Sequence, residues 1–418
     1  MAEVSDRLAL GYTRGRGGEG RFRGRGRPRH LPEGAGGNAG ASRVLERTHW
    51  KGDGPPGFTR LLDSFLKITF FVLAVGCSRN REREAGSRTM AALHDKFGRA
   101  ITDLRISITD RCNYKCVYCR TGNEGALYGD LPFADYLRMA RVLVGMGITK
   151  VRLTGGEPLL RKGVVEFVRE LAKLQYVGSP LDIALTTNGH LLAELAQPLK
   201  DAGLSRVTVS MDAVDPDRFT RITRVAGGYD HVLAGIRAAR KAGLGPVKVN
   251  CVLLRGFNED QIIPFGMFAR EEGVIVRFIE FMPLEEDRVW APSTVVTLDE
   301  ILARMSEYLP MVEIPRGPSE TARRYRFDDG IGEIGIIAPV SHPFCGHCSR
   351  IRITSDGKIR TCLFSVWDHD LHAQMRRGAT DEELAEYIRG VVMKKEERHH
   401  IGEPDFVPAS RTMVHIGG

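Results

Sequence analysis

The sequence predicts an α/β fold: a partial, TIM-like (β/α)6 barrel followed by a C-terminal extension that carries cysteines. Short apolar runs alternate with longer segments of helical periodicity from residue 100 onward, an order that is typical of a parallel sheet. Several helical segments end in glycine, a common stop for helices. Cysteines and polar turns follow the apolar runs, where barrel enzymes carry their chemistry.

The predicted elements alternate regularly along the chain. The predicted strands are Leu104–Thr109, Lys150–Thr154, Asp182–Thr187, Arg206–Asp212, Val247–Leu254 and Val274–Phe281. The predicted helices are Phe133–Gly147, Gly163–Leu174, Leu191–Gly203, His231–Gly243 and Glu259–Gly273. A closed barrel of this type has eight units, so six units predict an open one.

The net charge of +8 comes entirely from the start of the chain. Residues 1–89 hold 17 basic and 9 acidic side chains, whereas residues 90–418 hold 43 of each. Because the basic excess lies wholly in the first segment, it says nothing about the partners of the larger part, and we expect no nucleic acid among them. We expect no membrane association either, because the apolar run Ile68–Val75 is too short to cross a bilayer.

Residues 1–60 are rich in glycine, arginine and proline, which predicts a disordered, basic extension. Their arginine–glycine stretch could bind RNA, but a solvated tail is the simpler interpretation. Met90 begins a stretch that looks like an ordinary protein start. We therefore expect that the start of the protein was assigned too far upstream, and that residues 1–89 result from this. The predicted domains are therefore residues 1–89, the barrel at 90–283 and a C-terminal region at 284–418.

Six of the eight cysteines fall into two spaced triplets, which favours metal binding over disulfides. Cys112, Cys116 and Cys119 follow the first predicted strand. Three thiolates can hold three irons of a [4Fe–4S] cluster, which leaves one iron open to another ligand. The alternative is a structural zinc ion, which is usually held by four protein ligands that leave no coordination position open. Such clusters need a reducing compartment, so we expect a cytoplasmic protein.

The second triplet is Cys345, Cys348 and Cys362. Between its members runs an alternating segment in which Arg350 and Arg352 share one face. Guanidinium groups bind phosphate in bidentate fashion, so the pair predicts an anion site beside a metal site. His342 and His347, at the same loop, could instead complete a zinc site.

Further polar residues follow the other predicted strands. Each is a weak signal alone, since a lysine in a strand is usually solvated and a methionine usually fills the core. These segments are Thr154–Pro158, with its Gly-Gly-Glu-Pro turn, Thr186–Gly189, Ser210–Asp212, Lys248 and Glu280–Met282.

The first triplet, with Tyr118 directly before its last cysteine, and the Gly-Gly-Glu-Pro turn resemble the radical S-adenosylmethionine (SAM) superfamily. That resemblance implies that the open iron binds SAM and that the cluster's electron releases a 5′-deoxyadenosyl radical. The cofactor supplies the difficult chemistry, while the protein positions and shields it.

Three features narrow the resemblance: the second triplet, the segment Asp103–Ser107 and the terminal Gly417 and Gly418. Residues 90–418 resemble the GTP 3′,8-cyclase family, molybdenum cofactor biosynthesis protein A. The implied reaction takes hydrogen from ribose C3′ of GTP, after which the carbon radical attacks C8 of the guanine. The product is 3′,8-cyclo-7,8-dihydro-GTP, in the first step of molybdenum cofactor biosynthesis.

The resemblance also implies the site residues. Each cysteine triplet holds a [4Fe–4S] cluster, and the second cluster contacts the guanine. The implied SAM-binding residues are Tyr118, Gly156, Ser210 and Met282. The implied GTP-binding residues are Arg105, Arg152, Thr186, Lys248, Arg350, Ile351 and Arg352. Catalytic roles fall to Arg105, Arg350 and Arg352. The cationic members of this set suit a triphosphate on electrostatic grounds alone.

Other expectations concern partners and the C-terminus. We expect GTP and SAM as ligands, a reductant protein of flavodoxin or ferredoxin type, and hand-off of the product to cyclic pyranopterin monophosphate synthase. The sequence does not decide whether the protein forms a homodimer. The apolar run Met413–Ile416 should anchor the tail, so that the terminal glycines enter the active site and either Arg411 or a backbone group of the tail lies near GTP.

Two other classes of protein remain open. A different two-cluster radical SAM enzyme, such as a peptide-modifying maturase, would lack the phosphate-binding arginines and would usually carry more C-terminal cysteines. A zinc-binding regulator would have no activity and no iron.

Overall fold

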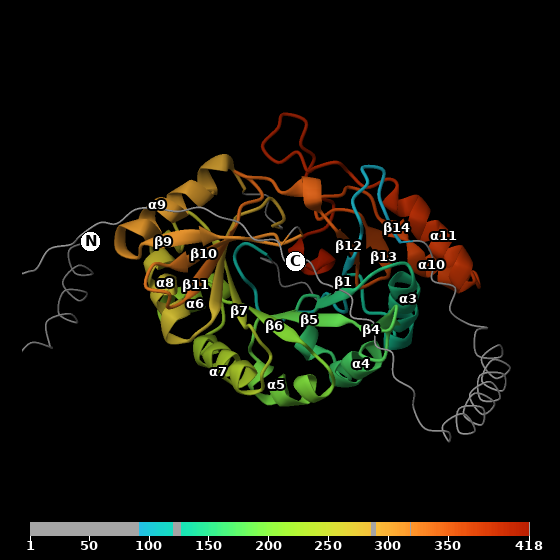
Figure 1. Cartoon of the computed structure of the whole chain (residues 1–418), viewed down its shortest axis with the longest axis horizontal. Coiled ribbons are helices and arrows are strands. Elements are labelled where there is room, and N and C mark those ends of the chain that lie inside the picture. Colours follow the sequence, from blue (N-terminus) through green and yellow to red (C-terminus); the bar gives the residue numbers. More distant parts are fainter. Residues whose placement is uncertain (1–91, 120–126, 286–289, 318, 418) are drawn as a thin grey trace, which may run out of the picture. The chain divides into compact units, whose positions relative to one another are not determined.

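A computed structural model describes residues 92–119, 127–285, 290–317 and 319–417 of the chain (Figure 1). The predicted extension at 1–89 lies outside the described residues, as does Gly418. No helix in the described ranges is long and apolar enough to cross a membrane.

Twelve strands form one sheet, in the order β14-β13-β12-β1-β2-β5-β6-β7-β8-β11-β10-β9. In chain order these strands are β1 Asp103–Ser107, β2 Lys150–Thr154, β5 Asp182–Thr187, β6 Arg206–Ser210, β7 Lys248–Leu253, β8 Ile275–Glu280, β9 Met311–Ile314, β10 Arg323–Phe327, β11 Glu333–Ile337, β12 Arg350–Ile353, β13 Lys358–Arg360 and β14 His369–Asp370. A separate small ribbon pairs β3 Gln175–Tyr176 with β4 Ser179–Pro180.

All six predicted strands are present, as β1, β2, β5, β6, β7 and β8, and each is parallel to the next. The predicted fold class is therefore confirmed. The helices on the outer side of the sheet (Figure 1) are α3 Phe133–Gly145, α4 Val164–Leu171, α5 Leu192–Asp201, α6 Pro216–Thr223, α7 Gly228–Lys241 and α8 Ile262–Glu271.

Five of these helices match the predicted segments, but the prediction missed α6. Its start carries readable signals: the Asp215 side chain accepts a hydrogen bond from the backbone N–H of Arg218 at 2.8 Å, and Pro216 occupies the first turn. Aspartate as N-cap and proline at the first helical position are favoured at helix starts. The helix was missed in spite of these signals because its apolar pattern covers only eight residues.

The C-terminal region joins both edges of the sheet. After β8, the strand β11 pairs with it in parallel, and β12 pairs in parallel with β1 on the opposite side. The antiparallel strands β9, β10, β13 and β14 complete the two edges. The C-terminal region therefore extends the barrel sheet at both edges. Its strand β12 also places its residues at the same register as those of β1.

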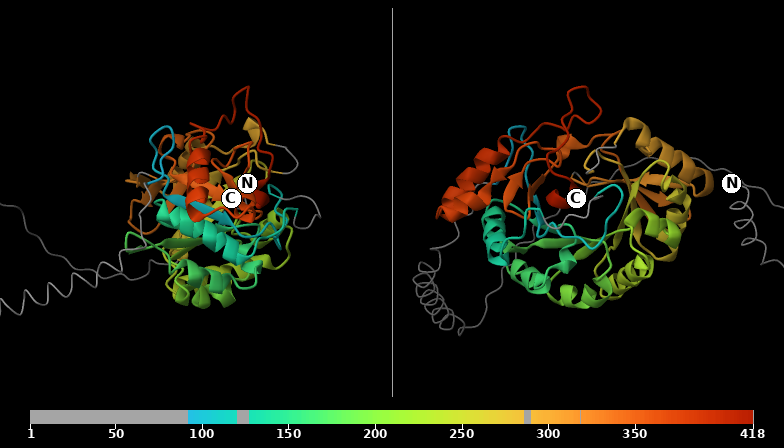
Figure 2. Two further views of the ribbon diagram at one scale, coloured as in Figure 1. Left: turned by 90° about the vertical axis from the view of Figure 1, so that its right-hand side faces the viewer. Right: turned by 180° about the vertical axis from the view of Figure 1, so that it is seen from behind.

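The remaining helices belong to the C-terminal region: α9 Leu298–Tyr308, α10 Leu371–Arg376, α11 Asp381–Val392 and α12 Met413–Ile416. Short 3-10 turns cover Pro158–Leu160, Glu259–Gln261, Pro292–Thr294 and Cys345–His347. Apolar strand residues such as Ile106, Leu153 and Val209 pack against the outer helices in the main core. Seen from behind in Figure 2, α12 lies inside the curve of the sheet.

Candidate active site

One cavity of about 470 Å³ lies inside the curve of the sheet, and all six cysteines of the two triplets line it. We call it the central cavity. The tertiary structure thus brings together two triplets that are far apart in the sequence.

The loop that carries the first triplet rests on the Gly-Gly-Glu-Pro turn. The backbone N–H of Gly156 donates to the carbonyl of Thr109 at 2.7 Å, and that of Glu157 to the carbonyl of Arg111 at 2.7 Å. A Cβ at Gly156 would lie 2.2 Å from the Arg111 carbonyl oxygen. A side chain at this position would therefore displace the cysteine loop.

Glu157 connects this turn to the end of β5. Its buried carboxylate accepts hydrogen bonds from the Thr187 hydroxyl at 2.7 Å and from the backbone N–H of Asn188 at 2.6 Å. Burial raises the pKa of Glu157 to about 7, although these hydrogen bonds oppose the shift. The carboxylate holds two βα turns in one arrangement at the rim of the cavity.

Tyr118 is fixed by a residue that the prediction did not include. Its hydroxyl donates to Asp212 at 2.7 Å, and Asp212 also accepts from the backbone N–H of Val252 at 2.8 Å. Burial raises the pKa of Asp212 to about 6, against these two hydrogen bonds. Tyr118 lines the central cavity together with the other predicted SAM-binding residues Gly156, Ser210 and Met282.

The histidines that a zinc site would need lie outside the cavity that the cysteines line. His342 and His347 are exposed and do not line the central cavity, whereas all six cysteines of the two triplets do. Cysteine thiolates are the usual protein ligands of iron–sulfur clusters.

Nearby positive charges prepare the second triplet to bind metal, because they favour the thiolate form of Cys348. Arg350 donates through Nη2 to the Cys348 sulfur at 3.3 Å, and its guanidinium lies 5.2 Å from the centre of the Phe344 ring. Although burial acts in the opposite direction, Arg350 and Lys395 lower the pKa of Cys348 to about 6. The deprotonated thiolate is the metal-binding form of cysteine.

Cationic side chains form a row across the floor of the cavity. Arg352 of β12, Arg105 of β1 and Arg152 of β2 lie at the same register on adjacent parallel strands. Lys248 of β7 and Arg277 of β8 line the same cavity. We call these five residues the cationic row. Three neighbouring strands with arginine at one level indicate a site for an anion with several charges.

The cationic row is only partly balanced by anions, since Asp103 acts on Arg105 and Arg152, and Glu320 acts on Lys248 and Arg277. Burial, followed by the nearby positive charges, lowers the pKa of Arg152 to about 10 and those of Arg277 and Arg352 to about 9. Among the described residues, the buried Nε atoms of Arg105 and Arg352 have no hydrogen-bond partner. Unsatisfied buried donors are costly, so this arrangement fits a polyanion that would neutralise and bind them.

Comparison with known proteins identifies the family. The Radical SAM superfamily model matches residues 106–268, and the Molybdenum Cofactor Synthesis C model matches residues 274–401. The GTP 3′,8-cyclase of Acidothermus cellulolyticus is 43% identical over 319 residues, which cover 73% of this chain and 87% of that protein. The GTP 3′,8-cyclase of Moorella thermoacetica is 43% identical over 333 residues, which cover 78% and 100%. The chain belongs to the GTP 3′,8-cyclase family.

The fold is shared more widely than the family. The chain is similar to Streptococcus suis SuiB bound to S-adenosylmethionine, with a TM-score of 0.52 and 15% identity over 75% of this chain and 78% of SuiB. At this identity the likeness concerns the fold alone. The assignment to the cyclase family rests on the closer sequence relatives.

The structure of this cyclase-family chain separates Ile351 from the other predicted GTP-binding residues. Arg105, Arg152, Thr186, Lys248, Arg350 and Arg352 line the central cavity. Ile351 points the opposite way along the alternating strand, and its side chain is fully buried in the main core. A contact of Ile351 with nucleotide would therefore have to come from its backbone.

Arg277 is a cavity residue that the sequence analysis missed. It donates through Nε to the Asn250 side chain at 2.9 Å, and its neighbours two positions away, Ile275 and Ile279, also line the cavity. The signal was the period of two in β8, which places Arg277 on the same face as them. An arginine inside an otherwise apolar strand would have marked it.

The C-terminal tail enters the cavity wall. Met413 and Val414 line the central cavity, while Ile416 packs with Leu284 and other residues in a second, smaller core. Gly417 has φ of 68°, and a Cβ there would lie 2.1 Å from Thr154 Oγ1. The tail therefore ends against β2, at the strand ends that carry the site.

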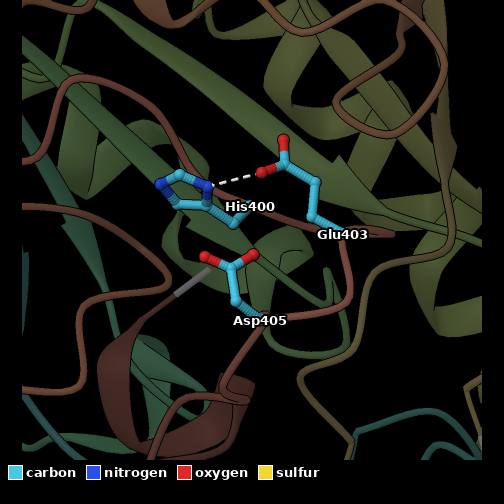
Figure 3. A group of neighbouring side chains, drawn as sticks. All are labelled: His400, Glu403 and Asp405. Carbon is cyan, nitrogen blue, oxygen red and sulfur yellow. Dashed lines mark hydrogen bonds and ion pairs between the residues drawn. The ribbon is translucent and has the colours of Figure 1, made fainter.

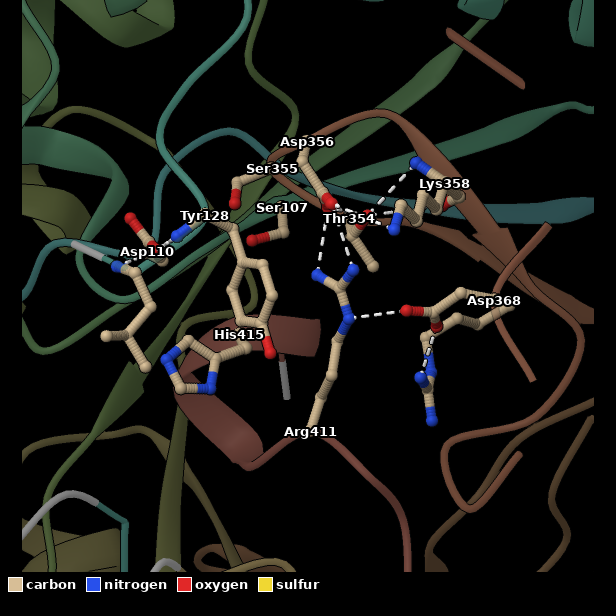
Figure 4. Close-up of polar contacts among 12 residues, drawn as sticks. Ser107, Asp110, Tyr128, Thr354, Ser355, Asp356, Lys358, Asp368, Arg411 and His415 are labelled. Carbon is tan, nitrogen blue, oxygen red and sulfur yellow. Dashed lines mark hydrogen bonds and ion pairs between the residues drawn. The ribbon is translucent and has the colours of Figure 1, made fainter. Parts of the chain in front are cut away.

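Arg411 forms ion pairs with two carboxylates. It donates to both carboxylate oxygens of Asp356 at 2.9 Å and to Asp368 at 2.6 Å (Figure 4). Its guanidinium also lies 3.9 Å from the centre of the Tyr128 ring. Two carboxylates hold Arg411 outside the cavity lining, so Met413 and Val414, and not Arg411, form the tail's part of that lining. Arg411 anchors the tail.

A surface group of potential metal ligands lies outside the cavity lining. His400, Glu403 and Asp405 bring their donor atoms within 4.8 Å of one another (Figure 3). Glu403 is already bound by His400 at 2.7 Å and by Arg398 at 2.7 Å. We interpret the group as an exposed ion-pair network.

Lys248 predicts a pH dependence of nucleotide binding. Burial, followed by the positive charge of Arg277, lowers the pKa of Lys248 to about 8. A triphosphate binds the protonated amine, so affinity should be full near pH 7 and fall as pH rises through about 8. Nucleotide titrations from pH 7 to 9.5 should show this step in the wild type and lose it in Lys248→Arg. The exposed Lys241→Met is the control, and an unchanged step in Lys248→Arg would exclude Lys248 as its source.

Proposed function

We propose that this chain is a radical SAM GTP 3′,8-cyclase that converts GTP to 3′,8-cyclo-7,8-dihydro-GTP in molybdenum cofactor biosynthesis. The observation that carries the proposal is the central cavity, which is lined by both cysteine triplets and by the cationic row. The cysteines suit two iron–sulfur clusters, and the row suits a triphosphate. A peptide substrate would leave the row only partly balanced.

The residues divide into two groups by the ligand they would hold. We assign the first cluster to Cys112, Cys116 and Cys119, with SAM next to Tyr118, Gly156, Ser210 and Met282. The second cluster belongs to Cys345, Cys348 and Cys362. When bound, the first cluster and SAM supply a 5′-deoxyadenosyl radical, and the second cluster supplies an open iron for the guanine.

The protein's own part is to hold GTP at both ends. The cationic row would bind the triphosphate, while the second triplet marks the end of the cavity for the base. Arg105, Arg350 and Arg352 would then contact the nucleotide nearest to the reacting ribose. Fixing the ribose between two anchored ends removes much of the entropy cost of the reaction.

The walls of the cavity would protect reactive species. Met282, Met413 and Val414 line it with apolar surface. Exclusion of water and of stray hydrogen donors prevents side reactions. The C-terminal tail therefore forms part of the wall of the central cavity and would lie beside the substrate.

A direct assay tests the proposal. The anaerobically reconstituted protein is incubated with SAM, GTP and dithionite, and the nucleotides are analysed by mass spectrometry. We expect the cyclic nucleotide together with 5′-deoxyadenosine and methionine. Cleavage of SAM without any change in GTP would instead favour another radical SAM activity on this fold.

The proposed partners follow from the chemistry. Each turnover needs electrons, so we propose a reductant protein of flavodoxin or ferredoxin type. The product would pass to cyclic pyranopterin monophosphate synthase, the next enzyme of the proposed pathway, and we also propose a homodimer. Oxygen-sensitive clusters require a reducing compartment, so we propose a cytoplasmic reaction.

Iron content gives a quantitative prediction. Four irons at each triplet predict about eight irons per reconstituted chain. Replacing Cys345, Cys348 and Cys362 by alanine should remove half of this iron and keep the spectrum of the first cluster. Iron and zinc are measured by elemental analysis under anaerobic conditions, with Cys251→Ala as the matched control. Full retention of iron, or zinc in its place, would contradict a second cluster.

The N-terminal extension should be dispensable, because residues 1–89 carry none of the site residues. A chain that begins at Met90 is expected to match the full chain in turnover. Comparing both proteins in the same anaerobic assay checks this, and a loss of solubility or activity would show that the extension is needed.

A further inference from the structure

A buried lysine lies behind the second cysteine triplet, outside the cavity lining. Lys395 follows α11 and is only 2% exposed. Its Nζ donates to the carbonyl of Arg350 at 3.0 Å and to the carbonyl of Thr361. Arg350 lies two residues after Cys348, and Thr361 directly precedes Cys362. One ammonium group therefore joins the two chain segments that present these two cysteines.

A second buried cation holds the third cysteine. Arg99 donates through Nη1 to the carbonyl of Cys345 at 2.9 Å and through Nη2 to that of Glu396 at 2.6 Å. Its Nε pairs with the carboxylate of Asp95 at 2.5 Å, so the charge of Arg99 is balanced locally. Because Glu396 is the residue after Lys395, the two cations hold the same stretch of chain.

Lys395 differs from Arg99 in its charge balance. Both of its partners are neutral carbonyl oxygens, and in the part of the chain that the structure describes it has no carboxylate partner. Burying an ammonium group without an anion is costly. The positive charge of Lys395 acts on the thiol of Cys348 in the second triplet. A cluster held by three thiolates would be the missing counter-ion.

We propose that Lys395 is a positioning residue for the second cluster: its ammonium group aligns Cys348 and Cys362 and compensates the negative charge of the bound cluster. This inference rests on the proposed function, which requires a cluster at the second triplet. A fixed positive charge stabilises the reduced form, which carries one more negative charge, and so raises the reduction potential. Charge, hydrogen bonding and burial are the means by which proteins adjust such potentials.

The main alternative is that Lys395 only fastens β12 to the segment after β13. Hydrogen bonds alone would affect stability but would leave the potential unchanged. The two roles are therefore separated by substitutions that keep or remove the charge. Lys395→Arg keeps the charge and donors, whereas Lys395→Gln keeps a donor and removes the charge. The exposed neighbour offers a matched control, Lys394→Gln.

The experiment measures the second cluster alone. Cys112, Cys116 and Cys119 are replaced by alanine in the full chain, which is reconstituted anaerobically with iron and sulfide. If this parent protein carries no iron, the two-cluster assignment has failed, and that result is distinct from any effect of Lys395. Iron content, thermal unfolding of the metal-free protein and the midpoint potential by electron paramagnetic resonance are then compared across the variants.

We expect Lys395→Gln to lower the potential, with a change of about tenfold in the equilibrium constant for reduction, or about 59 mV for one electron. Lys395→Arg and Lys394→Gln should retain the parent potential. If Lys395→Gln loses its iron while its metal-free stability and the iron of Lys395→Arg are retained, the positioning role is equally supported. An unchanged potential in Lys395→Gln, or equal loss of iron in both Lys395 variants, would overturn the proposal.

Discussion

Replacing both Arg350 and Arg352 by alanine is expected to weaken GTP binding roughly a hundredfold to ten-thousandfold, while SAM cleavage continues. Each arginine should contribute about 1.5–3 kcal/mol through charge-assisted hydrogen bonds, and about 1.4 kcal/mol corresponds to a factor of ten. The two side chains lie on one face of β12 and line the central cavity. Binding is measured with the anaerobically reconstituted protein, and SAM cleavage by the release of 5′-deoxyadenosine.

The single variants should differ from each other. Arg350 donates to the Cys348 sulfur at 3.3 Å, so Arg350→Ala should also disturb the second cluster. Arg352 has an unpartnered, buried Nε among the described residues, so Arg352→Ala should affect the nucleotide alone. Iron content distinguishes the two cases, and the exposed Arg326→Ala serves as control. Unchanged GTP affinity in both single variants would show that the arginines are structural.

Deleting Gly417 and Gly418 is expected to lower the yield of cyclised product by about a hundredfold, with both clusters retained. A misplacement of about 1 Å in an active site can cost this much. Gly417 ends the described tail against Thr154, where β2 reaches the cavity. Loss of the terminal residues should open this wall, so that SAM is still cleaved but GTP is less well oriented. The ratio of cyclic nucleotide to 5′-deoxyadenosine measures the coupling.

Two variants show whether the position of the tail is responsible. Gly417→Val adds a side chain where a Cβ alone would lie 2.1 Å from Thr154 Oγ1, so it should mimic the deletion. Arg411→Gln removes the ion pairs with Asp356 and Asp368 and should loosen the tail from outside the cavity. If the shortened protein forms the cyclic nucleotide at the full rate, the tail has no role in the reaction.

Much of the barrel could be predicted because its signals are local. Alternating apolar runs and helical periodicity marked all six strands of the parallel core, with ends that differ by at most two residues. The short helix α6 was missed, since eight residues hold too little periodicity to stand out. Both cysteine triplets were recognised by their spacing alone, because the number of residues between cysteines can be read directly from the sequence.

The site was only partly predictable. Alternation correctly placed Arg350 and Arg352 on one face, but it did not show which strand would lie beside them. Asp212 was noted only within a weak polar segment and Arg277 was missed, because their partners, Tyr118 in the loop after β1 and Asn250 on β7, come from other parts of the chain. Arg411 or a tail backbone group was expected near the substrate, since nothing in the tail itself indicates that Asp356 and Asp368 would bind Arg411.

The sequence by itself determined the strand–helix order, the two cysteine triplets and the positive charges of the site, because each depends on residues that are near one another in the chain. Only the tertiary structure decided that β11 and β12 join opposite edges of the sheet, so that Arg352, Arg105 and Arg152 align at one level. It also decided that the tail ends inside the cavity wall. Strand partners and buried ion pairs depend on packing between segments that are far apart in the chain. They can therefore not be predicted from any single stretch of sequence.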